Sequence, residues 1–437
     1  MEKIILLLDD CSAHTQMPED LASALNGMAT VHCVIGDEEN RILAAIATES
    51  PGILIDGRMR CSETKPAAWR LRAQHLFAVG MSRGPVPYGE PWNLFAVFNG
   101  NPETRLQVYT PEGGEIGCGS LAAFAKFIWR RAHVTWTRSV RIDDGCLTDP
   151  DAHERAVGLL AFAQDAHLFT DKNGNCSWRG READTLVVTP RQAVKADCLP
   201  NDLVIAKHDP ARRTLEYASP RKPSIDASVQ AALYAALPWI CGLLHIHPQA
   251  GLILPDTTTD FPYPCGAQEE ASAILHSLRH PDRKDAPFIV ELVHHGYLIG
   301  VEDGGAHRLL EEWRHASIAY QSHLVSIGKQ DLIRSLTLQP IMAEARIIGV
   351  LATDARKSWG SCYLLRSERG RGFGRRLLEP LARRRLNVRA HVRCGVSEFY
   401  QSHGWTVTEQ DTEFTTLAPP KTISGMDGET EMLQCVL

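Results

Sequence analysis

The sequence predicts a multidomain α/β protein. The chain has 437 residues, its apolar runs alternate with amphipathic stretches, and this pattern changes near residues 150 and 325. At roughly 150 residues per domain, the length suffices for about three domains. Short apolar runs bounded by turn residues indicate strands, and apolar residues three or four positions apart indicate helices. We expect an uncertain α/β domain over 1–150, a middle domain over 151–325, a C-terminal domain over 330–416 and a tail over 417–437.

Composition and charge exclude several classes of protein. The formal net charge is −6, so nothing predicts a nucleic-acid partner or an anionic membrane. The 12 cysteines show no paired spacing, which indicates reduced thiols in a cytoplasmic protein. The apolar run at residues 4–8 is too short to span a bilayer and lacks a cleavage signature. We expect it to be a buried strand.

In the N-terminal domain, the pattern predicts a strand over residues 105–110 and a helix over 120–131. The segment between them contains Cys118 and faintly resembles proteins of the diaminopimelate-epimerase and phenazine-isomerase type. In those proteins a Cys or Glu near this turn abstracts a carbon-bound proton. The resemblance implies that Cys118 lies at a helix start, which lowers a thiol pKa. A structural cysteine at a helix cap is the alternative.

The middle domain combines helical and strand patterns. Periodicity predicts helices over 151–165, 227–237 and 309–324, and strands over 185–189, 239–244 and 288–293. Histidines follow the last two strands: His245 and His247 after one, His294 and His295 after the other.

These histidines predict a metal site. Side chains two residues apart on a strand project from one face, so His245 and His247 can point their imidazoles at one position. We expect the second strand to neighbour the first and to end at the same edge, which adds a third imidazole. Neutral imidazole is a favoured zinc ligand, and a catalytic zinc commonly keeps three protein ligands and one open position. A histidine pair on the surface or in the core is the alternative.

Five motifs in order resemble the class II aldolase and adducin family over roughly 151–325. They are Gly174-Asn175, Thr189-Pro190, Pro223-Ser224-Ile225-Asp226, His245-Ile246-His247 and His295-Gly296. The resemblance implies an α/β/α domain that binds Zn²⁺ or another divalent metal. It also implies lyase chemistry: aldol cleavage or formation, epimerisation or dehydration of a small anionic hydroxy-carbonyl compound, such as a sugar phosphate.

The resemblance assigns roles to individual residues. It implies that His245, His247 and His295 hold the metal, with His294 outside the ligand set. Asp226 takes the position of the acid/base carboxylate, where most such aldolases have Glu and the ribulose-phosphate epimerase branch has Asp. Because Asp is also a good helix N-cap, capping of the helix that begins at Ala227 is the alternative.

The same resemblance implies a substrate-binding set. Gly174, Asn175 and Ser224 match residues that bind a substrate phosphate in the family. The family's Thr-Gly step is replaced by Arg191-Gln192. Arg191 either compensates as a bidentate partner for a phosphate or carboxylate, or lies in a solvated loop. Tyr263 lies where the family often places a catalytic tyrosine that reaches a neighbouring subunit, which implies a homo-oligomer.

The C-terminal domain shows strand patterns over 345–351 and 362–365, then a glycine-rich turn and a basic helix over 374–384. Free N–H groups at such a turn favour a pyrophosphate. Together with residues 398–405, the motif order resembles the GNAT acyltransferase superfamily over 330–416, which implies an α+β fold. The resemblance implies that Tyr400 protonates the leaving thiolate of acetyl-CoA or another acyl-CoA, bound by Arg369, Gly370, Arg371, Gly372 and Gly374.

The whole sequence therefore predicts a cytoplasmic multifunctional enzyme that acts on small molecules. A zinc-dependent lyase of the class II aldolase type would be fused to an N- or O-acyltransferase. The alternative is an adducin-like binding or scaffold module with a vestigial acyltransferase domain.

Overall fold

The structure is a computed structural model. It describes residues 2–8, 29–35, 53–56, 75–80, 95–98, 106–109, 115–119, 130, 134–142, 147–169, 172–247, 251–263, 265–278, 286–293, 295–354, 359–383, 387–391, 396–410 and 414–419. The chain divides into two compact units. The first comprises Met1–Thr135, Pro262–Cys265 and Ser424–Leu437, and the second comprises Trp136–Phe261 and Gly266–Ile423. No helix within the described residues is both long and apolar enough to cross a bilayer.

The first unit contains a seven-stranded sheet with the order β2-β1-β3-β4-β5-β6-β7. Its strands are β1 (Glu2–Leu8), β2 (Ala29–Ile35), β3 (Ile53–Asp56), β4 (His75–Gly80), β5 (Phe95–Phe98), β6 (Leu106–Tyr109) and β7 (Glu115–Gly119). Pairing is parallel from β2 to β5 and antiparallel from β5 to β7. The strands expected at residues 4–8 and 105–110 are confirmed.

The expected position of Cys118 is wrong. This residue lies inside β7, where it pairs with Gln107 of β6, because the segment continues the antiparallel meander. Apart from Arg130, which is helical, the helix expected over 120–131 lies outside the described residues.

The second unit contains a nine-stranded sheet with the order β15-β16-β17-β13-β9-β10-β11-β12-β8. Its strands are β8 (Arg138–Arg141), β9 (Asn175–Arg179), β10 (Thr185–Val188), β11 (Val204–Asp209), β12 (Thr214–Tyr217), β13 (Gly242–Ile246), β15 (Thr257–Thr258), β16 (Phe288–Leu292) and β17 (Gly296–Val301). The central strands β9, β10 and β13 are buried along nearly their whole length, as expected for strands covered by helices on both faces.

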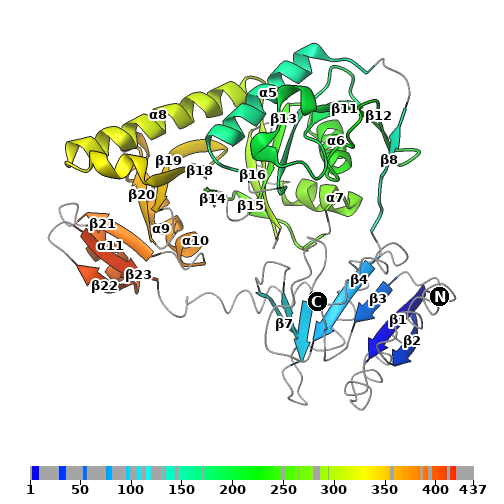
Figure 1. The fold of residues 1–437 in the computed structure, drawn as a ribbon, viewed down its shortest axis with the longest axis horizontal. Coiled ribbons are helices and arrows are strands. Elements are labelled where there is room, and N and C mark those ends of the chain that lie inside the picture. The colour runs from blue at the N-terminus through cyan, green and yellow to red at the C-terminus, as the bar shows by residue number, and fades with distance from the viewer. Residues whose placement is uncertain are drawn as a thin grey trace. The chain divides into compact units, whose positions relative to one another are not determined.

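Helices cover both faces of this sheet (Figure 1). α5 (Pro150–Asp165) and α8 (Gly305–Ser326) lie on one side, and α6 (Ala227–Ala236) and α7 (Gln268–Ser277) lie on the other. The expected helices over 151–165, 227–237 and 309–324 are confirmed. Asp149 starts α5 by accepting the N–H of Ala152 at 3.1 Å, and Pro150 occupies the first turn, where its missing N–H costs nothing. The result is an α/β/α layer arrangement.

Strand alternation decides which helices each residue faces. In β13, Leu244 packs in the cluster of α5 and α8, whereas Leu243 packs in the cluster of α6 and α7. His245 lies two residues after Leu243 on the same strand, so both side chains point to the same face of the sheet. The sheet therefore directs His245 toward the side covered by α6 and α7.

A second sheet of seven strands has the order β14-β18-β19-β20-β21-β23-β22. It contains β14 (Leu252–Leu254), β18 (Leu336–Ala343), β19 (Arg346–Asp354), β20 (Trp359–Leu364), β21 (Asn387–His391), β22 (Thr406–Gln410) and β23 (Phe414–Ala418), with α9 (Phe373–Arg376), α10 (Leu378–Arg383) and α11 (Val396–Ser402). The basic helix expected over 374–384 is instead two short helices separated at Leu377. Short 3₁₀ helices occur at Lys195–Asp197, Pro200–Asp202, Gln330–Arg334 and Arg366–Glu368.

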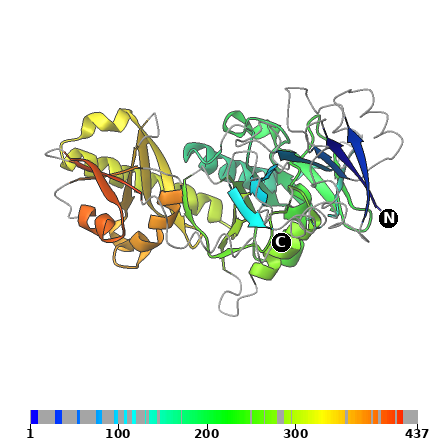
Figure 2. The same ribbon diagram turned by 90° about the horizontal axis from the view of Figure 1, so that it is seen from below.

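The two sheets of the second unit share one hydrophobic core. α8 packs on β19 as well as on α5, and both views show it running beside the C-terminal sheet (Figures 1 and 2). Trp313 and Tyr320 of α8 belong to the same buried cluster as Ile347 and Val350 of β19. α8 is therefore an internal layer between two sheets.

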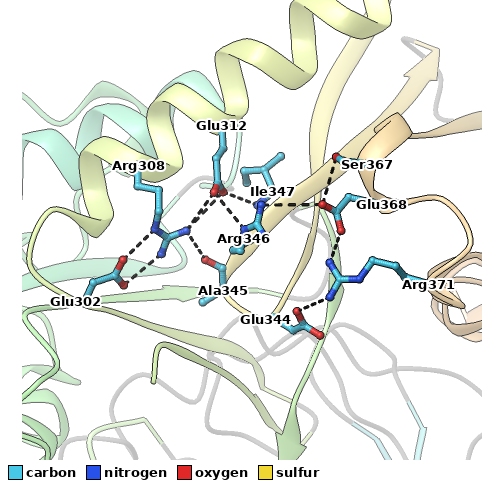
Figure 3. Close-up of polar contacts among 10 residues, drawn as sticks. All are labelled: Glu302, Arg308, Glu312, Glu344, Ala345, Arg346, Ile347, Ser367, Glu368 and Arg371. Atoms are coloured by element: carbon cyan, nitrogen blue, oxygen red, sulfur yellow. Dashed lines mark hydrogen bonds and ion pairs between the residues drawn. The ribbon is translucent and has the colours of Figure 1, made fainter. Parts of the chain in front are cut away.

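Polar contacts reinforce this junction (Figure 3). On α8, Glu312 accepts the backbone N–H of Ile347 at 2.9 Å and also contacts Arg308 and Arg346. Arg308 donates to the carbonyl of Ala345 at 3.1 Å. Glu344 and Ala345 have φ values of 54° and 51°, as in a tight hairpin turn between β18 and β19. The turn is thus bound to the helix by both backbone and side-chain atoms.

Candidate active site

Three histidines converge at one end of β13. One ring nitrogen from each of His245, His247 and His295 lies within 4.8 Å of the corresponding atoms of the other two. The ring centroid of His245 lies 5.1 Å from that of His247 and 4.7 Å from that of His295. Among the described residues, these three histidines form a group that could hold a metal ion.

The route by which His295 reaches the cluster differs from the expectation. The strands that precede the histidines are not neighbours, because β17 lies between β13 and β16. His295 lies in the tight turn that joins β16 to β17. Gly296 follows with φ of 132°, and a Cβ there would lie 2.2 Å from the carbonyl oxygen of Ile246. Only glycine allows this close approach. His294 lies outside the described residues.

His245 is oriented as a metal ligand. Its Nδ1 lies 3.1 Å from the carbonyl oxygen of Tyr297, so Nδ1 carries the proton and Nε2 keeps its lone pair. Nε2 is buried and has no hydrogen-bond partner within the described part of the chain. Burial and the neighbouring His295 lower the pKa of His245 to about 3, and burial with both neighbouring histidines lowers that of His247 to about 2. Neutral imidazoles around a buried acceptor fit a divalent cation such as Zn²⁺.

Glu270 of α7 holds the third imidazole. Its Oε1 lies 3.2 Å from Nδ1 of His295, and its side chain is only 5% exposed. Such a carboxylate fixes the orientation of a ligand imidazole and raises its basicity. Sequence reasoning missed Glu270, because nothing in the sequence distinguishes it from the adjacent Glu269.

Asp226 is oriented by a buried relay of side chains. Asn175 Nδ2 donates to Asp226 Oδ2 at 2.7 Å, and Gln230 Nε2 donates to Asn175 Oδ1 at 2.5 Å. Asn175 lies directly opposite His245 on the neighbouring strand. Asp226 occupies the N-cap of α6, but its side chain makes no capping hydrogen bond. Its second oxygen, Oδ1, is buried without a partner among the described residues, so capping does not explain this carboxylate.

The relay changes how two residues are interpreted. Asn175, expected to bind substrate, uses its amide to hold Asp226. Gln230 was missed, although it lies one helical turn after Asp226, a spacing that places both on one face of α6.

The other expected substrate-binding residues lie on adjacent segments. A bridge between Pro190 and Pro223 brings Arg191 beside Ser224. Gly174 has φ of 80°, and a Cβ there would lie 2.8 Å from the carbonyl oxygen of His245. The glycine therefore allows its turn to pack against the histidine strand. Tyr263 belongs to the first compact unit, where its hydroxyl accepts from Arg130 at 2.7 Å, and its catalytic role stays a prediction.

The residues expected to bind acyl-CoA follow β20. Gly370 and Gly372 have φ values of 81° and 82°, so the turn uses their conformational freedom. Arg371 contacts the buried carboxylate of Glu368 and, at 3.2 Å, Glu344 (Figure 3). Its guanidinium is thus paired within the protein. Arg369 lies over the ring of Tyr363, and Gly374 lies inside α9.

Tyr400 lies on α11, where its side chain is buried against Trp405. Burial, with a contribution from the Cys362 thiol, raises the pKa of Tyr400 well above its ordinary value.

Comparison with known families bears on the histidine site. Residues 156–295 match the family model described as Class II Aldolase and Adducin N-terminal domain. The chain contains a class II aldolase and adducin domain. The matched span includes Asp226 and all three clustered histidines. No curated protein matches the chain.

Solved structures of this class are similar to the chain at low identity. YgbL, a putative aldolase/epimerase/decarboxylase from Klebsiella pneumoniae, is 18% identical, with 35% of this chain and 80% of that chain covered and a TM-score of 0.27. An L-fuculose 1-phosphate aldolase is 16% identical, with 43% and 91% covered and a TM-score of 0.28. An aldolase II superfamily protein from Pseudomonas syringae is 17% identical, with 40% and 79% covered and a TM-score of 0.29.

Proposed function

We propose that the aldolase-type domain is a divalent-metal-dependent lyase or epimerase that acts on a small anionic hydroxy-carbonyl compound. The observation that supports this most directly is the convergence of neutral imidazoles beside an oriented, buried carboxylate. His245, His247 and His295 would hold the cation. When bound, Zn²⁺ supplies Lewis acidity to a substrate carbonyl oxygen.

Asp226 is the proposed acid/base. Its Oδ2 is fixed by Asn175, so Oδ1 is left to take a proton from a carbon or hydroxyl next to the carbonyl and to return it to the product. The relay through Gln230 prevents the carboxylate from rotating away. The same proton transfer serves aldol cleavage, epimerisation or dehydration, and the substrate decides among them.

Metal analysis tests the proposal. We expect the purified protein to contain about one equivalent of a divalent metal and His245→Ala to lose it. In D₂O, the metal-loaded protein should exchange the hydroxymethyl protons of hydroxypyruvate or dihydroxyacetone phosphate, as observed by NMR. A folded protein that neither holds metal nor catalyses exchange would support the adducin-like scaffold instead.

For the C-terminal sheet we propose acyl-CoA binding and acyl transfer to an amine or hydroxyl. In support, the glycine-rich turn follows β20, and the chain then crosses through α9 and α10 to β21, which is parallel to β20. Ligands commonly bind outside the carboxyl ends of such parallel strands. The Tyr400 side chain is buried against Trp405, and its phenol is the group that would donate the proton.

Calorimetric titration with acetyl-CoA tests this second activity. We expect saturable binding, and we expect Tyr400→Phe to retain that binding while lowering kcat with a general amine acceptor. Absence of any acetyl-CoA binding would remove the transferase proposal. Homo-oligomer formation, which would place Tyr263 at a neighbouring subunit, stays a prediction that light scattering can test.

A further inference from the structure

Two segments that are distant in sequence pair beside Asp226. The backbone N–H of Arg191 donates to the carbonyl of Lys222 at 2.8 Å, and the N–H of Ser224 donates to the carbonyl of Thr189 at 3.1 Å. This pairing fixes Arg191 next to the segment that carries the acid/base. Desolvation lowers the pKa of Arg191, and the charge of Asp226 partly opposes this shift.

The guanidinium of Arg191 is fixed on one side and open on the other. Its Nε donates to the carbonyl of Pro223 at 3.3 Å, and its Nη2 donates to the hydroxyl of Ser139 at 3.3 Å. Its Nη1 makes no hydrogen bond within the described part of the chain. A planar guanidinium held in this way presents donors in a fixed plane, which suits the two oxygens of a carboxylate.

The turn after Arg191 contains a residue in the left-handed region. Gln192 has φ of 57°, a conformation that L-residues other than glycine adopt infrequently. This conformation leads the chain into the short helix that begins at Lys195. The turn therefore sets the positions of Arg191 and Lys195 together.

Lys195 forms hydrogen bonds to the turn before Gly174 and to the turn after Arg191. Its ammonium donates to the carbonyls of Lys172 at 3.0 Å and Ala193 at 2.9 Å, and its side chain is buried. Lys172 precedes the Gly174-Asn175 turn, and Ala193 follows Arg191. Lys195 thus links the two segments expected to contact substrate, and it adds a second positive charge near Asp226.

The side-chain donors left for a ligand lie mainly on Arg191. The side chain of Asn175 is used by Asp226 and Gln230, and the backbone N–H groups of Arg191 and Ser224 are used in segment pairing. On these residues the donors that remain are the two N–H groups of Arg191 Nη1, the second N–H of its Nη2 and the hydroxyl of Ser224. The Nη1–Nη2 edge of the guanidinium is planar and can donate two parallel hydrogen bonds to the two oxygens of a carboxylate.

We infer that the anionic end of the substrate is a carboxylate, bound by Arg191 and Ser224, with Lys195 as a positioning residue. The substrate class is then a small hydroxy-keto acid. This inference rests on the proposed metal-dependent function, because the metal would bind the carbonyl end of the same molecule.

Three hydroxamates test the inference on the zinc-loaded protein by calorimetry. Acetohydroxamate carries no anion, succinate monohydroxamate carries a carboxylate, and phosphoglycolohydroxamate carries a phosphate. We expect the carboxylate compound to bind about 10- to 100-fold more tightly than acetohydroxamate, the range of one charge-assisted hydrogen-bonded pair, and more tightly than the phosphate compound. Tighter binding of the phosphate compound would overturn the inference while leaving the metal site intact.

Variants separate the roles of the two cations. Arg191→Met should abolish the advantage of the carboxylate compound, with zinc content and acetohydroxamate affinity unchanged. Arg191→Lys should retain part of it, because the charge remains without the planar donors. Lys195→Met should weaken carboxylate binding and Lys195→Arg should restore it.

Arg212→Met is the matched control, since this arginine lies in the turn between β11 and β12 and its side chain is 76% exposed. An Arg191→Met protein that retains full carboxylate affinity would overturn the inference. Failure of all three hydroxamates to bind would instead overturn the metal site, and the inference with it.

Discussion

Oε1 of Glu270 and Nδ1 of His295 lie 3.2 Å apart, and both side chains are largely buried. The carboxylate comes from the first turn of α7, whereas the imidazole comes from the turn before β17. Tyr297 does the same for His245 through its backbone carbonyl. Two of the three imidazoles are therefore oriented by a group outside the cluster.

Glu270→Gln should weaken zinc binding by about 10- to 100-fold, because the neutral amide orients His295 less well and lowers its basicity. Competition with a chromophoric chelator measures this directly. Glu311→Gln, on the exposed face of α8, is the control and should leave the affinity unchanged. Equal zinc affinity in Glu270→Gln and wild type would show that the contact is merely structural.

Asp226→Asn should lower the rate of proton exchange by about 10²- to 10⁴-fold, the usual contribution of a positioned acid/base. Zinc content should stay near that of the wild type, because three imidazoles remain. Exchange into hydroxypyruvate in D₂O, followed by NMR, provides the measurement. Asp151→Asn, which alters an exposed carboxylate, should exchange normally. Loss of zinc in Asp226→Asn would reassign this carboxylate as a metal ligand.

Anion affinity should fall as pH rises through about 8. Burial lowers the pKa of Lys195 from 10.5 to about 8, so its ammonium is present below that pH and is lost above it. The ratio of succinate monohydroxamate to acetohydroxamate affinity should fall several-fold between pH 7 and 9, and Lys195→Arg should abolish the fall. A ratio independent of pH in the wild type would contradict this assignment.

The lowered pKa of Lys195 also makes the free energy of unfolding depend on pH. In the unfolded chain Lys195 titrates near 10.5, so between about pH 8 and 10.5 the unfolded state binds more protons than the folded state. The contribution of this residue therefore makes the free energy of unfolding increase with pH in that window. Comparison of urea unfolding at pH 8 and 10 for wild type and Lys195→Met isolates it.

Glu312→Gln should lower the free energy of unfolding of the whole second unit by about 1–3 kcal/mol, because a carboxylate that accepts the Ile347 N–H and two guanidiniums is replaced. Calorimetry should still show one transition for both sheets, since they share one core. Glu311→Gln should change stability by less than about 0.5 kcal/mol. Two separate transitions in the wild type would contradict a common core.

Much of the fold could be predicted from local pattern. The helices around α5, α6 and α8 and the strand around β10 have strong periodicity and clear ends. The His245-His247 spacing also predicted their common direction, because side-chain alternation is a local property. The helix after Gly372 was predicted as continuous, but it is divided at Leu377, whose side chain is buried.

The remainder depended on tertiary contacts. The insertion of β17 between the histidine strands reflects a hairpin that periodicity alone does not reveal. Glu270 and Gln230 acquire their meaning only from the imidazole and amide that they contact. The resemblance to epimerase-type proteins implied a helix start at Cys118, yet this residue lies in a strand and pairs with Gln107.

β14, only three residues long, joins the C-terminal sheet although it follows His247 in the chain. Its pairing with β18 joins the segment that follows the histidine strand to the C-terminal sheet, although the two are far apart in the sequence. A cut in the chain between β14 and β18 would therefore separate the edge strand of the C-terminal sheet from the rest of that sheet.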